Sequence, residues 1–320
     1  MAVRTKYELK LGAATREAFG KALVELGRKN NNVVVLDADL SKSTMTAGFL
    51  KEFPERFFEC GIAEANMVSI AGGLAAAGKI PFASSFSAFL LNKGFEQLRV
   101  AVAYPHTNAK FVGTHSGISI GEDGPSQMSI EDLALACALP GFVVMSPADE
   151  AATKALVHAA ADHVGPVFIR CGRVKVAAIY AEDQQFEIGK SIQLQDGTDI
   201  TLIAHGLMVA EALKASDMLF AEGISARVID MHTIKPIDRE AIAKASRETG
   251  AIVVAEEHLV DSGLGARVAQ VVSEEAPCIM GYVGVENTYA ESGSPEAVLQ
   301  KYGMTAENVA AAARKTLARK

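Results

Sequence analysis

Short apolar runs rich in β-branched and aromatic residues alternate along this chain with alanine-rich stretches of helical periodicity. A helix over Thr15–Lys29 would bury Phe19, Leu23 and Leu26, which follow an i, i+4, i+7 spacing. Strands that alternate with helices at this rhythm favour a mostly parallel sheet with helices on both faces. The strands predicted in the first half are Val33–Leu36, Arg56–Cys60, Ile80–Ser84, Lys110–Thr114, Phe142–Met145 and Val167–Arg170. The other helices predicted there begin near Glu64, Asn92, Ser129 and Ala148.

The rhythm stops once and restarts, which indicates two domains and an α/β fold class. A polar stretch that contains AEDQQFEIGKS is predicted as a linker over residues 181–195, between a first domain at 1–180 and a second at 196–320. The second domain is expected to contain another mostly parallel sheet flanked by helices. Its predicted strands lie in DITLIAH, SARVID, AIVVAEE and CIMGYVG, and its helices are expected from Leu207, Asp238, Gly263 and Thr305.

Composition excludes several classes of protein. The net charge of −7 provides no basic excess for a nucleic-acid or anionic membrane surface. The four cysteines contain no CxxC pair, so neither a zinc site nor a disulfide framework is indicated. The N-terminus lacks an apolar signal core, and the soft run at 62–82 is too polar to make a good membrane span. We therefore expect a cytoplasmic protein with reduced thiols.

Polar residues follow the ends of several predicted strands. Asp37 and Asp39 follow the first strand, Glu64 the second, Ser84–Phe89 the third and His115 the fourth. Because ligands of open parallel sheets bind beyond the carboxyl ends of the strands, these residues predict a site at one sheet edge. The alternative is that strand ends are simply where polar residues begin.

The loop at residues 113–127, GTHSGISIGEDGPSQ, is long for a strand-to-helix connection and contains four glycines. Long loops in compact domains are often functional, and glycine lets the backbone approach a ligand closely. Within the loop, residues 117–121 match the GxSxG pattern of hydrolase nucleophile elbows. That motif needs serine at a strand-to-helix corner, whereas Glu-Asp-Gly-Pro follows here, so the hydrolase reading is disfavoured.

With these residues in view, the chain resembles the transketolase family over essentially its whole length. The segments that carry the resemblance are RFFECGIAEANMVSIAGGLAAAG, PFASSFSAFL, GTHSGISIGEDGPSQMSIEDLA and ENTYAESGSPEAVLQKYG. They are similar to the pyrimidine-binding domain and the C-terminal domain of a transketolase. The form IGEDGPSQM resembles the animal-type branch, since many bacterial and fungal members have histidine at the position of Gln127.

The resemblance implies thiamine diphosphate as cofactor. Glu64 then matches the glutamate that hydrogen-bonds N1′ of the aminopyrimidine and favours the imino tautomer, which takes the proton from C2. An apolar niche formed by Ile62, Met67, Phe86 and Phe89 would raise the pKa of such a carboxyl. Without the resemblance, Glu64 would be interpreted as an acidic residue that stabilises the first turn of the following helix.

Other residues match the family's ring and substrate contacts. Phe86 and Phe89 match the aromatic residues that pack on the pyrimidine, although their spacing also suits core packing. Some family members have a third aromatic residue at the position that is Asn92 here. Gln127 is expected to donate a hydrogen bond to cofactor or substrate. The matches to sugar-phosphate contacts are Arg16, Ser43, His115, Asp123 and Arg173.

These substrate contacts have a chemical rationale. Arginine is suited to phosphate because its planar fork donates hydrogen bonds in pairs. His115 is additionally expected to assist proton transfer near neutral pH.

The chain lacks the Gly-Asp-Gly signature of the domain that binds the diphosphate and its metal. The resemblance therefore implies a separate N-terminal subunit, which would hold the diphosphate and Mg²⁺ or Ca²⁺, with no metal ligands in this chain. Two copies of each subunit would form a heterotetramer.

The implied reaction is transfer of a two-carbon ketol unit from a ketose phosphate to an aldose phosphate, as in the pentose phosphate pathway. Three alternatives keep the fold and change the substrates: a modified-sugar transketolase, a deoxyxylulose-phosphate-synthase-like enzyme, and a 2-oxoacid dehydrogenase β subunit. A non-catalytic regulatory subunit is the alternative from another class.

Overall fold

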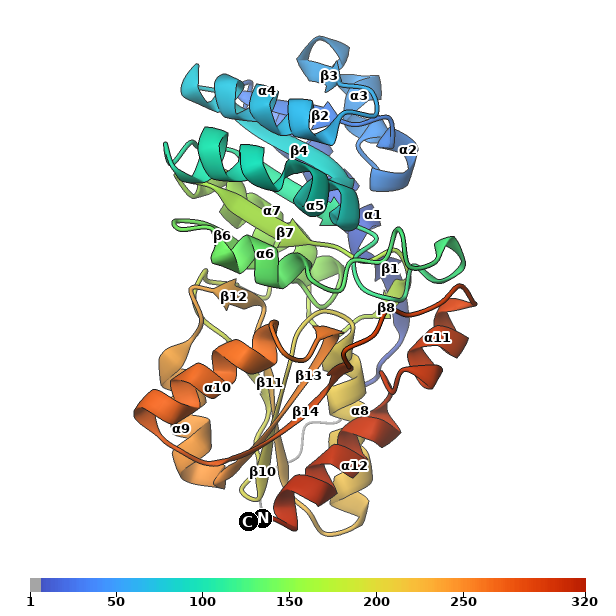
Figure 1. Ribbon diagram of the computed structural model, residues 1–320, viewed down its shortest axis with the longest axis vertical. Helices are drawn as coiled ribbons and strands as arrows, with labels where there is room; N and C mark the ends of the chain where they lie inside the picture. Colours follow the sequence, from blue (N-terminus) through green and yellow to red (C-terminus); the bar gives the residue numbers. More distant parts are fainter. Residues whose placement is uncertain (1–6) are drawn as a thin grey trace.

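The computed structural model describes residues 7–320, which form two α/β domains, drawn one above the other in Figure 1. Each domain contains a sheet with helices on both faces, as the sequence predicted. No helix within residues 7–320 combines the length and the apolar content that crossing a membrane requires.

In the described part of the chain, the first sheet has the strand order β12-β6-β7-β5-β4-β2-β3. All neighbouring pairs are parallel except β12 with β6. The carboxyl ends of the parallel strands therefore lie at one edge of the sheet. The strands are β2 (Val33–Asp37), β3 (Phe57–Glu59), β4 (Ile80–Phe86), β5 (Lys110–Thr114), β6 (Val143–Met145), β7 (Val167–Arg170) and β12 (Thr233–Lys235).

Helices cover both faces of this sheet because alternate strand residues are apolar on each side. Val35 and Phe82 pack with α1, α3 and α7, whereas Leu36 and Ala83 pack with α4, α5 and α6. A π-helical turn, η2, continues α5, and a 3-10 turn, η1, precedes β3. These elements are α1 (Thr15–Lys29), α2 (Ser41–Thr44), α3 (Ala47–Glu52), η1 (Pro54–Arg56), α4 (Glu64–Ala76), α5 (Ser87–Gln97), η2 (Leu98–Ala103), α6 (Asp132–Ala138) and α7 (Glu150–Asp162).

The second sheet has the strand order β14-β13-β10-β11-β9, in which only β9 is antiparallel to its neighbour among the described residues. The helices α8 and α12 pack on one face of this sheet and α9 and α10 on the other. The elements are β9 (Ile192–Gln195), β10 (Ile200–Ala204), α8 (Met208–Ala221), β11 (Ala226–Asp230), α9 (Arg239–Thr249), β13 (Ala251–Leu259), α10 (Leu264–Glu275), β14 (Ile279–Val285), α11 (Pro295–Lys301) and α12 (Ala306–Leu317).

The two domains share a continuous apolar interior. Phe86, Ile118 and Ile120 of the first domain belong to the same buried cluster as β10, β13 and α8 of the second. A small ribbon of β1 (Leu11–Ala14) and β8 (Lys175–Ala177) also lies near the junction (Figure 1). Helix α11 runs beside the loop that contains the 3-10 turn η3 (Gly121–Asp123), so both domains contribute to the surroundings of this loop.

Among the differences from the sequence prediction, three concern the start of α5, the linker and the edge of the first sheet. Helix α5 begins at Ser87 rather than near Asn92. The sequence does not indicate this start, because the N-cap residue Phe86 has no side chain that could cap the helix. Strand β9 lies inside the stretch expected as linker and joins the second sheet. Strand β12 leaves the second domain to extend the first sheet, a pairing that no local pattern indicates.

Candidate active site

The predicted site residues follow the carboxyl ends of parallel strands in the first sheet. Glu64 begins α4 shortly after β3, Phe86 ends β4, His115 directly follows β5 and Arg173 follows β7. Because these strands run in the same direction, the side chains come to one edge, as strand ends in an open sheet require.

Glu64 is buried, with 3% of its surface exposed, at the first position of α4. Its Oε1 atom lies 3.1 Å from the ammonium of Lys93 on α5. The expected niche was entirely apolar, and the structure corrects this: Met67 is buried, but Ile62 is 78% exposed and Lys93 supplies a positive charge. Glu64 is thus a buried carboxylate with a cationic partner.

Three rings form a stacked row beside this carboxylate. Phe86 and Phe89 have ring centroids 5.6 Å apart with an interplanar angle of 18°. On the other side, Phe86 stacks on the imidazole of His115 at 3.9 Å and 27°. Lys93 lies over Phe89 at 4.2 Å from its centroid, which links the row to Glu64. A stacked aromatic row next to a buried carboxylate is a suitable surface for a heteroaromatic ring with a hydrogen-bonding nitrogen.

His115 is held in a single orientation. Its backbone has a φ of 57°, and its Nδ1 and Nε2 atoms lie 2.9 Å from Thr114 Oγ1 and 3.3 Å from an Arg16 NH1 atom. Arginine can only donate, so Nε2 accepts from Arg16 and we assign the ring proton to Nδ1, which donates to Thr114. Burial, and then the charges of Arg16 and Arg173, lower the pKa of His115 to about 3. The imidazole is therefore neutral at pH 7, whereas the sequence-based expectation was titration near neutrality.

The phosphate-binding candidates gather around His115. The NH1 group of Arg16 also donates to the carbonyl oxygen of Ser43 at 2.7 Å. Its Nε atom is buried and has no hydrogen-bond partner within the described chain. Burial lowers the pKa of Arg16, and the charge of Arg173 acts in the same direction. Two guanidinium groups close enough to influence each other, one with an unused donor, have the donor chemistry that an anion-binding site requires.

Arg173 is already paired in this structure. It donates to Glu122 Oε2 and to the carbonyl oxygen of Ile120, both at 2.6 Å. The hydrogen bond from Arg173 lowers the pKa of Glu122. Arg173 therefore ties η3 to the phosphate-binding candidates.

Asp37 supports the segment that contains Ser43. Its carboxylate accepts hydrogen bonds from the Leu40 amide and from the hydroxyls of Thr44 and Thr46, at 2.7–2.8 Å. Burial nevertheless raises the pKa of Asp37 to about 6. This polar strand-end residue is thus a structural support for α2 rather than a free ligand.

The remaining candidates lie on the rim. Asp123 is exposed in η3, and Gln127 accepts a hydrogen bond from the neighbouring hydroxyl of Ser126. Neither side chain hydrogen-bonds to Glu64, His115 or the two arginines in residues 7–320. Asn92 donates to Glu131 at 2.9 Å, so a polar pair stands where some family members have an aromatic residue.

Sequence reasoning missed Lys93 and gave no role to Glu122. Lys93 follows Phe89 by four residues, which places both side chains on one helix face once α5 begins at Ser87. The signal was present, but the misplaced helix start concealed it. The GxSxG pattern has no hydrolase geometry: Ser119 is fully buried in a loop, away from any strand-to-helix corner.

Two family descriptions match this chain. "Transketolase, pyrimidine binding domain" covers residues 12–177, and "Transketolase, C-terminal domain" covers residues 189–309. The fold is therefore that of a pyrimidine-binding domain followed by a transketolase C-terminal domain. The chain belongs to the transketolase family, a membership that implies thiamine diphosphate as cofactor.

Several relatives are chains of similar length. A Methanocaldococcus jannaschii protein described as a transketolase C-terminal section is 45% identical over 92% of this chain and 93% of its own length. The 6-deoxy-6-sulfo-D-fructose transketolase subunit SqwH of Clostridium sp. (strain MSTE9) is 39% identical over 95% of each chain. Human transketolase is 41% identical, and the match covers 94% of this chain but 48% of the human one.

A solved structure agrees with these matches. The structure named "Split gene transketolase, inactive beta4 tetramer" is 52% identical and superimposes with a TM-score of 0.90 over 96% of this chain and 99% of its own.

The described residues include no group of three or more His, Cys, Asp or Glu side chains that could hold a metal ion.

The site residues fit the pyrimidine half of thiamine diphosphate. Phe89, the outer ring of the stacked row, offers an aromatic face, whereas Phe86 is buried between Phe89 and His115. The buried Glu64 offers a hydrogen-bonding carboxylate beside this row. The unpartnered Nε of Arg16 fits an anionic group of a second ligand next to His115.

Proposed function

We propose that this chain is the C-terminal subunit of a two-component transketolase that transfers a two-carbon ketol unit from a ketose phosphate to an aldose phosphate. The observation that carries the proposal is the row that runs from Glu64 through Phe89, Phe86 and His115 to Arg16. It provides a surface for a cofactor ring at one end and a cationic site for a sugar phosphate at the other.

Each residue in the row has a proposed task. Glu64 would hydrogen-bond the pyrimidine nitrogen and hold a proton there, and Phe86 and Phe89 would pack against the ring. Thiamine diphosphate, when bound, supplies the electron sink that carbon–carbon bond cleavage needs. His115, neutral and with Nδ1 bonded to Thr114, would hydrogen-bond the substrate through Nε2 after Arg16 turns to the phosphate.

The substrate phosphate is proposed to bind between the guanidinium groups of Arg16 and Arg173, with Ser43 alongside. Asp123 and Gln127 lie on the loop that would face the sugar hydroxyls and the cofactor. Charge supports this assignment, because the unused Nε donor of Arg16 is buried and an anion would relieve its unmet hydrogen bond.

A separate N-terminal subunit is proposed to bind the diphosphate with Mg²⁺ or Ca²⁺ and to complete a heterotetramer. Two observations support this: the chain matches about half of human transketolase, and the similar split-gene tetramer of β chains alone is described as inactive. A cytoplasmic location belongs to the same proposal and is supported by four cysteines that remain free of disulfides.

The test is reconstitution. The chain is mixed with an N-terminal transketolase subunit of the same organism, thiamine diphosphate and Mg²⁺, and turnover of xylulose 5-phosphate with ribose 5-phosphate is measured. Glu64→Gln should reduce turnover about 100-fold or more if the carboxyl holds a proton in the reaction. Glu240→Gln, an exposed carboxyl in the first turn of α9, is the matched control and should leave turnover unchanged.

Two other functions are distinguishable from this one. A modified-sugar transketolase is favoured by the similarity to a subunit named for 6-deoxy-6-sulfo-D-fructose, and a panel of phosphorylated and sulfonated ketoses would identify it. If the chain were instead a regulatory subunit, the mixture would turn over equally well with the wild-type chain and with Glu64→Gln. Loss of turnover in that variant excludes the regulatory role.

A further inference from the structure

The loop at residues 117–127 lies on the first domain but is anchored in the second. Ile118 and Ile120 are fully buried in the cluster formed with the second domain. The loop connects His115, two residues before it, to Glu122 and Asp123 in η3. The placement of Asp123 and Gln127 within this loop therefore depends in part on contacts from the other domain.

Glu257 of β13 makes a polar contact with this loop. Its side chain is buried, and Oε1 accepts a hydrogen bond from the Ser119 amide at 2.5 Å across the domain boundary. Gly117, at a φ of 79°, packs so close that any Cβ there would overlap the Glu257 carboxyl. Burial of Glu257 raises the pKa of its carboxyl. A buried carboxyl is costly unless it is hydrogen-bonded, and the Ser119 amide supplies such a bond.

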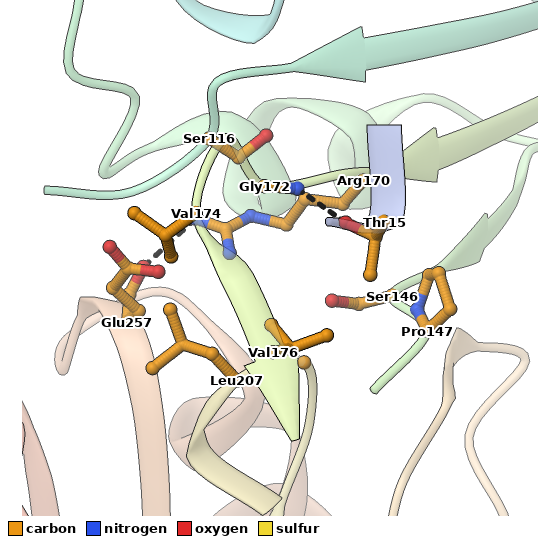
Figure 2. Close-up of a pocket in the computed structure, with 11 residues that line it drawn as sticks. Thr15, Ser116, Ser146, Pro147, Arg170, Gly172, Val174, Val176, Leu207 and Glu257 are labelled. Carbon is orange, nitrogen blue, oxygen red and sulfur yellow. Dashed lines mark hydrogen bonds between the residues drawn. The ribbon is translucent and has the colours of Figure 1, made fainter. Parts of the chain in front are cut away.

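The backbone of Glu257 is fixed from the first domain as well. Arg170 donates to the Glu257 carbonyl oxygen at 2.8 Å, and its Nε atom pairs with Asp132 at 2.9 Å. Asp132 in turn accepts from the hydroxyl of Ser87, the first residue of α5, at 2.7 Å. Figure 2 shows the hydrogen bond between Arg170 and Glu257 at the wall of a small cavity of about 20 Å³ between the domains. Glu257 is thus connected both to the loop and to the helix that contains Phe89.

A second contact holds the far end of the same loop. A Cβ at Gly121 would meet the Gly293 carbonyl oxygen and the ring of Pro295, and a Cβ at Gly124 would meet the hydroxyl of Ser292. Both glycines have positive φ values. The segment before α11 therefore packs directly on η3, beside the Glu257 contact.

We propose that Glu257 is a positioning residue, through which the C-terminal domain sets the 117–127 loop, and with it Asp123 and Gln127, for the sugar phosphate and the cofactor. This inference rests on the proposed function for its kinetic part only. Glu257 touches no cofactor or substrate candidate itself. The proposal gives the C-terminal domain a role in positioning the residues that would contact the substrate.

The first experiment is hydrogen–deuterium exchange of the full chain, without partner or cofactor. In Glu257→Ala, amides of 117–127 should exchange roughly ten- to hundredfold faster, because the buried Ser119 amide is left without its acceptor. Glu257→Gln keeps an acceptor oxygen and should restore most of the protection. Glu307→Gln, an exposed carboxyl in the first turn of α12, is the control. Wild-type exchange in Glu257→Ala would overturn the proposal.

The second experiment is kinetic and uses the reconstituted enzyme. Glu257→Ala should raise the KM for the sugar phosphate about tenfold or more, while saturation with thiamine diphosphate stays within about twofold. Glu257→Gln should recover the wild-type KM. If Glu257→Ala does not fold, Gly117→Ala, whose Cβ would displace the same carboxyl, must give the same rise in KM. An equal loss of cofactor and substrate affinity would indicate general misfolding and reject the positioning role.

The two proposals fail differently. If the wild-type mixture shows no transketolase turnover, the proposed function fails, but the exchange experiment still decides whether Glu257 orders the loop. If turnover is normal and the loop exchanges equally in all variants, only the positioning proposal fails.

Discussion

Lys93 Nζ lies 3.1 Å from Glu64 Oε1 and 4.2 Å from the centroid of the Phe89 ring. The lysine side chain is about half exposed, at 48%, whereas the glutamate side chain is 4% exposed. Within residues 7–320, the half-exposed Lys93 is thus the charged partner of this buried carboxylate. A ring that binds against Glu64 would compete with Lys93 for the carboxylate, and Lys93 is the partner free to move into solvent.

This pair predicts a measurable coupling. Lys93→Met should destabilise the isolated chain by about 1–3 kcal/mol, because it leaves a buried carboxylate without its donor. In the Glu64→Gln background the same substitution should cost much less. Urea denaturation of the wild type, both single variants and the double variant gives the coupling energy. A value near zero would mean that the ion pair contributes nothing.

Arg16 predicts a selective effect on phosphorylated substrates. Arg16→Met in the reconstituted enzyme should raise the KM for a ketose phosphate about 10- to 100-fold, the loss of one or two charge-assisted hydrogen bonds. A ketol donor without phosphate should be affected far less. Arg28→Met, at the other end of α1 and paired with Glu52, is the matched control. Equal effects on both donors would remove Arg16 from the phosphate site.

The sequence predicted the parts of the fold that local patterns determine. Lys110–Thr114 and the helix Thr15–Lys29 have the predicted bounds, because a buried apolar run and a regular i, i+4, i+7 pattern are local signals. The pairing of β12 with β6 joins segments that lie far apart in the chain and has no such signal. The start of α5 was misplaced because no polar cap marks it.

The strand ends and the family resemblance placed Glu64, Phe86, Phe89, His115 and Arg16 at one site. The structure brings these residues together, and their functional roles stay predictions. Partners that come from other elements were not predictable. Lys93 depends on the correct start of α5, and Glu257 reaches Ser119 across 138 residues. The neutral state of His115 follows from burial and two arginines, which a sequence does not display.

His115 predicts a pH dependence of stability. Its pKa is about 3 in the folded chain, below the ordinary value of 6.5, so between these values the unfolded chain binds a proton that the folded chain does not. Stability should therefore fall as the pH drops from 6.5 towards 3, by at most about 1.4 kcal/mol per pH unit from this group. In His115→Gln this contribution is absent, so urea denaturation at pH 7, 6 and 5 should show a shallower decline. An unchanged slope would contradict the buried, neutral imidazole.

Among the substitutions considered, replacement of Asp132 is expected to cause the largest loss of stability. Its carboxyl is fully buried, and burial alone would raise its pKa, but the charge of Arg170 and hydrogen bonds from Ser87 and Arg170 hold the pKa below the ordinary value. Asp132→Ala leaves the Arg170 guanidinium buried without a counter-charge and should cost about 3–5 kcal/mol.

A second aspartate–arginine pair provides the control for this loss. Asp196 is paired with Arg227 at 3.1 Å but is itself 58% exposed, and Glu248 also pairs with Arg227. Asp196→Ala should therefore cost less than about 1 kcal/mol. Both values come from urea denaturation at pH 7. Similar costs for the two variants would show that burial of Asp132 does not make its pairing with Arg170 critical.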